Sequence, residues 1–140
     1  TSRITMTGES GGAWTTAVYA ALDTRISRSV PVAGSLPLFA IERLNTCVDF
    51  EYSNPQLLGA MNFLDMMILA SCDRGRKQVQ VTHQFDQYFY GLFPYTYEAI
   101  VKRVLSGYCE GQWDFLITPE EVHQFGEEAT EVVLRLANEE

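Results

Sequence analysis

The 140-residue chain has only two histidines and three cysteines, and both shortages limit the chemistry it can support. The number of cysteines is odd, and no two of them have C-x-x-C spacing: they are Cys47, Cys72 and Cys109. This argues against a zinc site and a full disulfide framework. One bridge plus a free thiol remains open, so the cysteines leave the compartment undetermined. We expect no metal and no cofactor.

Basic residues are also few, with 10 Lys and Arg against 18 Asp and Glu, and the net charge is −8 at pH 7. This balance argues against nucleic acid or an anionic membrane surface as a partner. The longest apolar candidate, residues 61–70, is interrupted by Asp65 and is much shorter than the roughly 20 residues of a membrane span. The length and the 46% hydrophobic content are enough for one domain with a real core.

Hydrophobic periodicity alternates along the chain between strand and helix patterns. We expect strands at residues 3–7, 29–34, 78–83 and 113–117, and helices from residue 14, from 54 to 68, over 97–105 and over 129–136. Pro31 is awkward in a central strand, so we place it at the start of its strand. Residues 35–52 are poorly patterned and are expected to be loop with some helix. The alternation predicts an α/β fold with a mainly parallel sheet and helices on both faces. In such sheets, ligands bind beyond the carboxyl ends of the strands.

The segment from Gly8 to Gly12 fits G-x-S-x-G, the pattern of a nucleophile elbow, with Ser10 at its centre. A strand pattern precedes it and a helix pattern follows, as the elbow requires. We expect the glycines on either side of Ser10 to make room, because a Cβ at either position would crowd the neighbouring chain. Ser10 then lies at a helix N-terminus, and the Gly11 N–H is a candidate oxyanion donor. The alternative is a glycine-rich loop with a solvated serine.

A serine nucleophile needs a base, and the two histidines are the candidates. His123 lies between the last strand and the last helix, at the same sheet edge as Ser10. His83 lies at the end of its own strand, so we interpret it as a packed, hydrogen-bonded histidine.

The acid of a triad must also lie just beyond a strand. Asp86 does so, immediately after the strand that ends near His83. Asp114 lies inside its strand, and Asp73 precedes one and would lie at the wrong end. Glu120 and Glu121 are close to His123 but are interpreted as surface charges on its own loop. The chain order Ser10, Asp86, His123 is that of α/β-hydrolases.

Aromatic residues flank the proposed acid and could wall a substrate pocket. The candidates are Phe85, Tyr88 and Phe89, and Glu9 is a further possible substrate contact. Ordinary core and rim packing is the competing interpretation for the aromatic residues. Glu9 could instead be an exposed elbow residue.

On these residues the chain resembles the carboxyl-terminal half of an α/β-hydrolase, of the bacterial esterase-like and peptidase-like kind. The resemblance is carried by residues 8–16, 20–23, 29–34, 85–86 and 123–125. It implies that the four strands are the fifth to eighth of the family's sheet. It also implies that residues 1–140 form a single partial domain, that the amino-terminal half is absent, and that the second oxyanion donor lies outside this chain. The exposed sheet edge could then support self-association.

The resemblance and the residues together predict a serine hydrolase that cleaves a carboxylic ester by a Ser-His-Asp acyl-enzyme mechanism. Two alternatives remain open: a serine peptidase or amidase on the same fold, and a non-catalytic α/β-hydrolase-like binding module. The isolated chain could be inactive because one oxyanion donor is missing.

Overall fold

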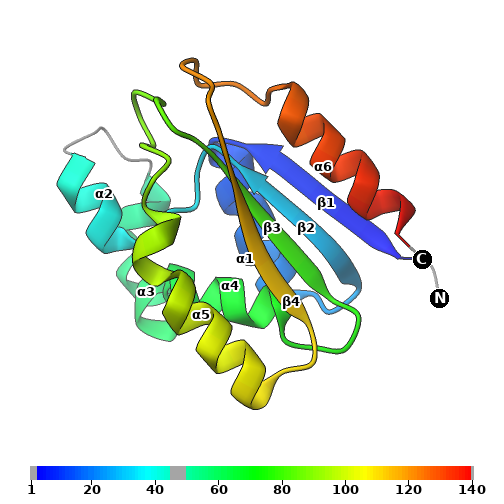
Figure 1. Ribbon diagram of the computed structural model, residues 1–140. Coiled ribbons are helices and arrows are strands. Elements are labelled where there is room, and N and C mark those ends of the chain that lie inside the picture. The colour runs from blue at the N-terminus through cyan, green and yellow to red at the C-terminus, as the bar shows by residue number, and fades with distance from the viewer. Residues whose placement is uncertain (1–2, 45–49, 140) are drawn as a thin grey trace.

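A four-stranded parallel sheet forms the centre of the molecule in the computed structural model, which describes residues 3–44 and 50–139. Its strands are β1 (Ile4–Glu9), β2 (Ile26–Val32), β3 (Lys77–His83) and β4 (Gln112–Thr118), and they lie side by side in chain order. All three pairings are parallel. The expected mainly parallel α/β sheet is therefore confirmed, with every strand ending at one edge (Figure 1).

Helices cover both faces of this sheet, as the alternating pattern predicted (Figure 1). One face carries α1 (Gly11–Leu22), α4 (Phe63–Ser71) and α5 (Pro94–Tyr108), and the other carries α6 (Glu127–Asn138). The remaining helical segments are the short α2 (Leu38–Leu44), η1 (Phe50–Ser53) and α3 (Pro55–Ala60). Beneath α6, its Val132 and Leu136 pack with Val79 and Val81 of β3 in one buried cluster. The apolar face of the last helix thus packs against β2 and β3.

Pro31 does not start its strand, contrary to expectation, because β2 begins at Ile26 and Pro31 is its penultimate residue. It pairs with Gly8 across the β1–β2 ladder. The missing N–H of proline costs one ladder hydrogen bond, and a position next to the strand's end limits that loss. Ser29, Val30 and Val32 around it are buried, as a strand covered on both faces requires.

The single helix expected from residue 54 to 68 is two helices, α3 and α4, and this part of the sequence interpretation was wrong. Each begins with an asparagine cap: Asn54 accepts from the N–H groups of Gln56 and Leu57, and Asn62 accepts from those of Leu64 and Asp65. The Asp65 carboxylate in turn accepts from the Asn62 N–H, which completes a capping box. The N-x-x-D spacing was visible in the sequence and overrides the apolar periodicity there.

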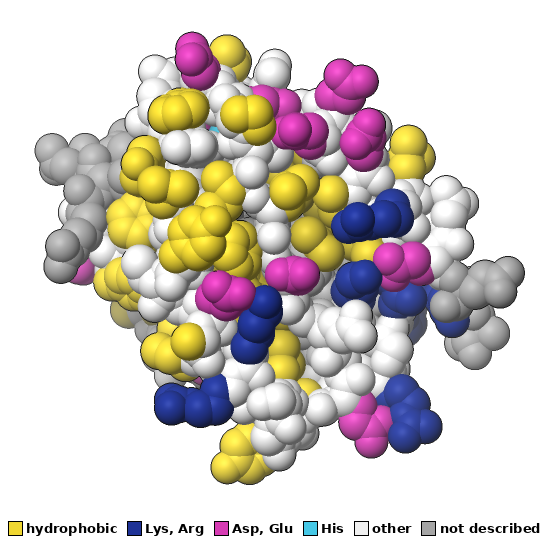
Figure 2. Space-filling view, viewed as in Figure 1, with side chains coloured by type: hydrophobic (Ala, Val, Ile, Leu, Met, Phe, Trp, Pro, Cys, Tyr) yellow, Lys and Arg dark blue, Asp and Glu magenta, His cyan; other side chains and the backbone are white. Residues whose placement is uncertain are grey.

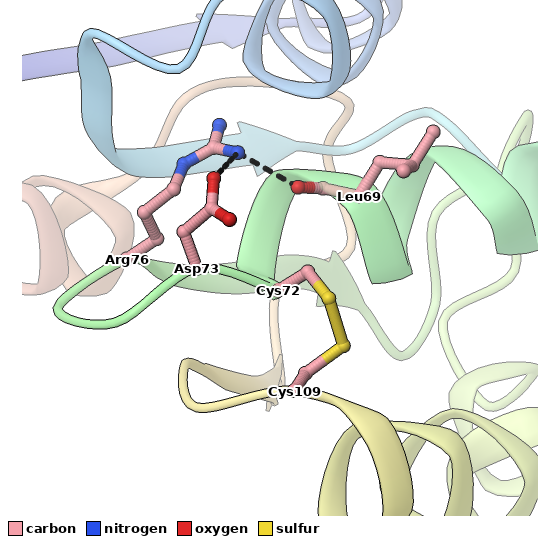
Figure 3. The surroundings of a disulfide bond; sticks show 5 residues. All are labelled: Leu69, Cys72, Asp73, Arg76 and Cys109. Atoms are coloured by element: carbon pink, nitrogen blue, oxygen red, sulfur yellow. Dashed lines mark hydrogen bonds and ion pairs between the residues drawn. A yellow bond between two sulfur atoms is a disulfide. The ribbon is translucent and has the colours of Figure 1, made fainter.

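A disulfide joins Cys72, just after α4, to Cys109, just after α5 (Figure 3). It realises the single-bridge possibility that the cysteine count left open; Cys47 lies outside the described residues. Arg76 lies nearby, its Nη1 2.8 Å from the Leu69 carbonyl and 3.5 Å from Asp73 Oδ2. The bridge joins the ends of α4 and α5 at the amino-terminal edge of the sheet, away from the proposed site, and the guanidinium holds the end of α4.

Candidate active site

Ser10 occupies a sharp turn between β1 and α1, with φ 57° and ψ −118°. A positive φ is uncommon for a residue with a side chain and costs about 1–3 kcal/mol unless the surroundings hold it. Its N–H donates to the Val32 carbonyl at 3.0 Å, and its own carbonyl accepts from the Ala13 N–H at 2.9 Å. The hydroxyl makes no capping bond to α1, so the backbone bonds hold the turn and the Ser10 side chain is not used as a helix cap.

Glycine is required on one side of the elbow only. A Cβ on Gly8 would lie 2.5 Å from the Gly12 carbonyl oxygen, and a Cβ on Gly34 would lie 2.8 Å from the Ser10 carbonyl oxygen. Gly12 itself has open space where its Cβ would stand. The expectation that a Cβ would clash at both motif glycines was therefore right for Gly8 and wrong for Gly12. Gly12 matters because its backbone is what a Cβ on Gly8 would strike. Gly34 was not singled out from the sequence.

A buried chain of hydrogen bonds supports the segment behind the elbow. The Tyr97 hydroxyl of α5 donates to Gln80 Oε1 at 2.7 Å, and Gln80 Nε2 donates to the Ser35 carbonyl at 3.3 Å. Burial raises the pKa of Tyr97, so this phenol stays protonated and remains a donor. Because Gly34 packs against Ser10, this network helps to fix the position of the turn. Sequence reasoning missed it, since buried glutamine and tyrosine give no periodic signal.

Asp86 and His123 come together at the carboxyl edge of the sheet. Asp86 Oδ2 lies 2.7 Å from His123 Nδ1, although the two residues are 37 positions apart in the chain. The other oxygen, Oδ1, accepts from the N–H groups of Tyr88 at 2.7 Å and Phe89 at 3.0 Å. The Asp86 side chain is fully buried, while the His123 side chain remains 16% exposed. The carboxylate is therefore fixed by backbone donors and presents one oxygen to the imidazole.

Two of the three expected aromatic residues contact the His123 ring. Phe89 stacks on it with a centroid distance of 5.6 Å, and Tyr88 meets it edge-on at 5.2 Å. Phe85 is exposed, and among the described residues it makes no ring contact with His123. Tyr90 and Phe93, further along the same segment, line an apolar cavity of about 220 Å³. The segment after Asp86 thus supplies the packing around His123 and, further along the chain, part of the wall of a separate apolar cavity.

Glu9, rather than Ser10, faces the other nitrogen of His123. Glu9 Oε1 lies 3.1 Å from His123 Nε2, and within the described part of the chain no hydrogen bond joins the Ser10 hydroxyl to His123. Glu9 is the last residue of β1 and directly precedes Ser10. The structure thus brings Asp86, His123 and Glu9 into direct contact and places Ser10 beside them, one residue from Glu9.

His83 has the structural role that the sequence suggested. It is fully buried, with Nδ1 2.6 Å from Thr118 Oγ1 and Nε2 2.7 Å from the Gln124 carbonyl. These partners lie at the two ends of the loop that carries His123. Glu120 is not a simple surface charge as expected, because its Oε2 is buried 3.6 Å from His83 Nδ1 and its carboxylate packs against Gly126. Glu121 is exposed.

The rival acids lie elsewhere. Asp114 is exposed on β4, 3.6 Å from the Lys102 ammonium of α5. Asp73 lies beside Arg76, before β3, at the opposite edge of the sheet from His123. Neither can reach the imidazole without rebuilding the fold.

Charge is distributed unevenly over the molecule. Figure 2 shows Asp and Glu side chains at the upper end, where β4 leads into α6, and Lys and Arg lower in the view. The basic residues Arg25, Arg28, Arg76 and Lys77 cluster near the starts of β2 and β3. In the described residues no group of three or more His, Cys, Asp and Glu side chains could hold a metal ion. No helix among them is long and apolar enough to cross a membrane.

Solved structures identify the class of fold. Methylesterase BT1017 matches 95% of this chain with a TM-score of 0.67 at 20% identity. A Pyrococcus furiosus esterase, PF2001, matches 96% of the chain with a TM-score of 0.61 at 14% identity. An acylaminoacyl peptidase, solved in complex with Z-Gly-Gly-Phe-chloromethyl ketone, matches 88% with a TM-score of 0.60 at 12% identity. The chain therefore has the fold of the α/β-hydrolases.

The chain spans only part of those proteins: 28% of the methylesterase, 51% of the Pyrococcus furiosus esterase and 20% of the peptidase. No protein-family model matches the sequence, and no curated protein matches it either. At these identities the likeness shows the fold alone.

Proposed function

We propose that this chain carries the catalytic residues of a serine hydrolase that cleaves a carboxylic ester. Ser10 is the nucleophile, His123 the base and Asp86 the residue that orients it. The single observation that carries the proposal is the 2.7 Å contact between Asp86 Oδ2 and His123 Nδ1, with Asp86 held by two backbone N–H groups. That contact fixes the Nδ1–H tautomer and leaves Nε2 as the atom that accepts a proton.

The reaction proceeds in two halves. The Ser10 hydroxyl gives its proton to His123 Nε2 while Oγ bonds to the ester carbonyl carbon, and the carbonyl π pair moves onto oxygen. His123 then returns the proton to the departing alkoxide as the C–O bond breaks, which leaves an acyl-serine. Water, deprotonated by the same nitrogen, releases the acid and restores Ser10.

The first turn of α1 supports an oxyanion site. Helix N-terminal N–H groups have no partner within the helix, and the helix dipole favours negative charge there. We assign the Gly11 N–H as one donor. A second donor is proposed to come from outside this chain, as part of a larger hydrolase domain. Loss of one donor typically costs ~10²–10³ in rate, so a longer protein should be far more active than residues 1–140.

The open side of β1 supports that larger domain. Among the described strands β1 pairs only with β2, and its other edge is unpaired. A free parallel edge invites another strand, either from the same protein or from a second copy of the chain. Size-exclusion chromatography of both chain lengths separates these cases: self-association should appear in residues 1–140 and disappear in the longer protein.

An ester is favoured over an amide by the names of the similar structures, which include a methylesterase, an acetyl xylan esterase and the Pyrococcus furiosus esterase. The acylaminoacyl peptidases of the same fold keep the peptidase alternative open. Hydrolysis rates for matched acyl esters and acyl amides of the same acid distinguish the two.

The decisive experiment is labelling of the complete protein with a fluorophosphonate probe, which reacts with activated serines. We expect a label on Ser10 that Ser10→Ala abolishes and Ser35→Ala does not. Ser35 is a matched control because it also has a positive φ (60°) but follows β2 rather than β1. A folded wild-type protein that takes no label would favour the binding-module alternative.

A further inference from the structure

Glu9 places a second carboxylate on the proposed base. The two ring nitrogens of His123 each face a carboxylate oxygen: Nδ1 lies 2.7 Å from Asp86 Oδ2, and Nε2 lies 3.1 Å from Glu9 Oε1. Glu9 comes from β1 and Asp86 from the loop after β3, so the ring is held between two separate elements. The hydroxyl that should occupy the Nε2 side belongs to the next residue, Ser10.

This arrangement requires one more proton than the catalytic state. A neutral imidazole carries a single N–H, whereas an ionised carboxylate can only accept. Both contacts of His123 are satisfied when both ring nitrogens are protonated, or when a protonated Glu9 donates to Nε2. In either form the Nε2 lone pair is occupied and cannot accept the proton of Ser10.

The other groups around His123 do not supply that proton. Phe89 and the Tyr88 ring pack on the imidazole, Glu120 is turned toward His83, and Glu121 is exposed. Among the ion pairs of the described residues, the only one that Glu9 makes is with His123. Within residues 3–44 and 50–139 no arginine or lysine forms an ion pair with Glu9, so the contact at Nε2 of His123 has no competing cation there.

We propose that Glu9 is a positioning residue, which retains a proton on the Nε2 side of His123 in the resting enzyme and must lose it before Ser10 can be activated. The inference rests on the proposed function. The released proton goes to solvent; Glu9 then leaves Nε2, and the Ser10 hydroxyl takes its place as the donor. No bond other than N–H or O–H changes in this step, and it needs no co-reactant.

The test is the pH profile of fluorophosphonate labelling of Ser10 in the complete protein, from about pH 5 to 8, where histidine sites change charge. The variant Glu9→Gln cannot hold the proton as a carboxylate does. We expect it to be labelled roughly tenfold faster than wild type at the acidic end, the size expected for one charge-assisted hydrogen bond. The ratio of the two rates should fall as the pH rises.

Two matched variants separate contact from charge. Glu9→Asp keeps the charge but shortens the side chain by one methylene, so it should follow Glu9→Gln. Glu121→Gln removes the same charge from an exposed position on the His123 loop and should keep the wild-type profile. Circular dichroism verifies folding; should Glu9→Gln fail to fold, Glu9→Asp decides by the same profile.

The outcomes separate this inference from the function on which it rests. A wild-type protein without label would remove the proposed function itself. A labelled wild type with a pH-independent ratio for Glu9→Gln would overturn the role of Glu9 and leave the function standing. An equal shift in Glu121→Gln, or a wild-type profile in Glu9→Asp, would also overturn it, because long-range charge would then explain the effect.

Discussion

Replacing Asp86 with asparagine tests the acid–base pair with little change of shape. Asp86 Oδ1 accepts from two backbone N–H groups, those of Tyr88 and Phe89. These donors select the orientation of the new amide, because its oxygen must face them. The amide nitrogen then occupies the place of Oδ2, 2.7 Å from His123 Nδ1.

The consequence for His123 is an inverted tautomer. The amide donates to Nδ1, so Nδ1 must carry the lone pair and the proton moves to Nε2. An Nε2–H cannot accept the proton of Ser10. In serine triads this change lowers kcat by ~10⁴, or about 5.5 kcal/mol of transition-state stabilisation. The two backbone bonds survive, so we expect a much smaller change in the free energy of unfolding.

The assay compares ester hydrolysis, the rate of fluorophosphonate labelling and thermal unfolding in wild type, Asp86→Asn and Asp114→Asn. Asp114 is the matched control, since it was the chief rival as the acid and lies on exposed β4 beside Lys102. We expect Asp86→Asn to lose labelling while keeping its fold, and Asp114→Asn to retain both. Wild-type labelling of a folded Asp86→Asn would refute the assignment of the acid.

Three further predictions follow from the packing. Gly8→Ala should destabilise the fold by about 1–3 kcal/mol and abolish labelling, because its Cβ would strike the Gly12 carbonyl, whereas Gly12→Ala enters open space and should be tolerated in thermal unfolding. Reducing the Cys72–Cys109 bridge, which spans 37 positions, should lower the free energy of unfolding by about 3–4 kcal/mol and the Tm by about 10 °C, measured by calorimetry with Cys47→Ala as the control. An unchanged Tm would contradict this prediction. His83→Phe leaves the Gln124 carbonyl without its ring donor and should cost about 1–3 kcal/mol in denaturant unfolding. If a folded His83→Phe lost labelling as completely as His123→Ala, the choice of His123 as the base would be wrong.

Most of the fold was predictable because each element carried its own local signal. The strands and the helices α1, α5 and α6 were expected within a few residues of their observed bounds, since their apolar periodicity matches the face that they bury. The failures came where a single polar or cyclic residue outweighed that pattern. Asn62 caps a new helix within an apolar repeat, and Pro31 is accommodated near the end of a strand that begins at Ile26.

The sequence indicated which residues would come together at the candidate site better than it indicated their individual contacts. Chain order and strand ends were sufficient to predict that Asp86 and His123 lie close together, because parallel strands deliver their following loops to one edge. Nothing in the sequence indicated that Glu9 would occupy the Nε2 side, since that depends on the path of a loop rather than on a pattern. The hydrogen-bonded support from Tyr97 and Gln80 was invisible for the same reason.

The path of that loop explains how the two parts of the site meet. Ser10 follows β1 and His123 follows β4, at opposite edges of the four described strands. At a strand spacing of about 4.8 Å, the strand ends lie about 14 Å apart, far beyond hydrogen-bond reach.

The chain after β4 must therefore turn back over the sheet, and α6 does pack on β1 and β2 rather than beside β4. His83 fastens both ends of the returning loop, to Thr118 and Gln124, and the 3.1 Å contact with Glu9 shows that the imidazole has crossed to β1. Glu9, the present partner of His123, directly precedes the serine that His123 is proposed to activate, so we expect a rearrangement of side chains, without movement of the sheet, to bring the two together.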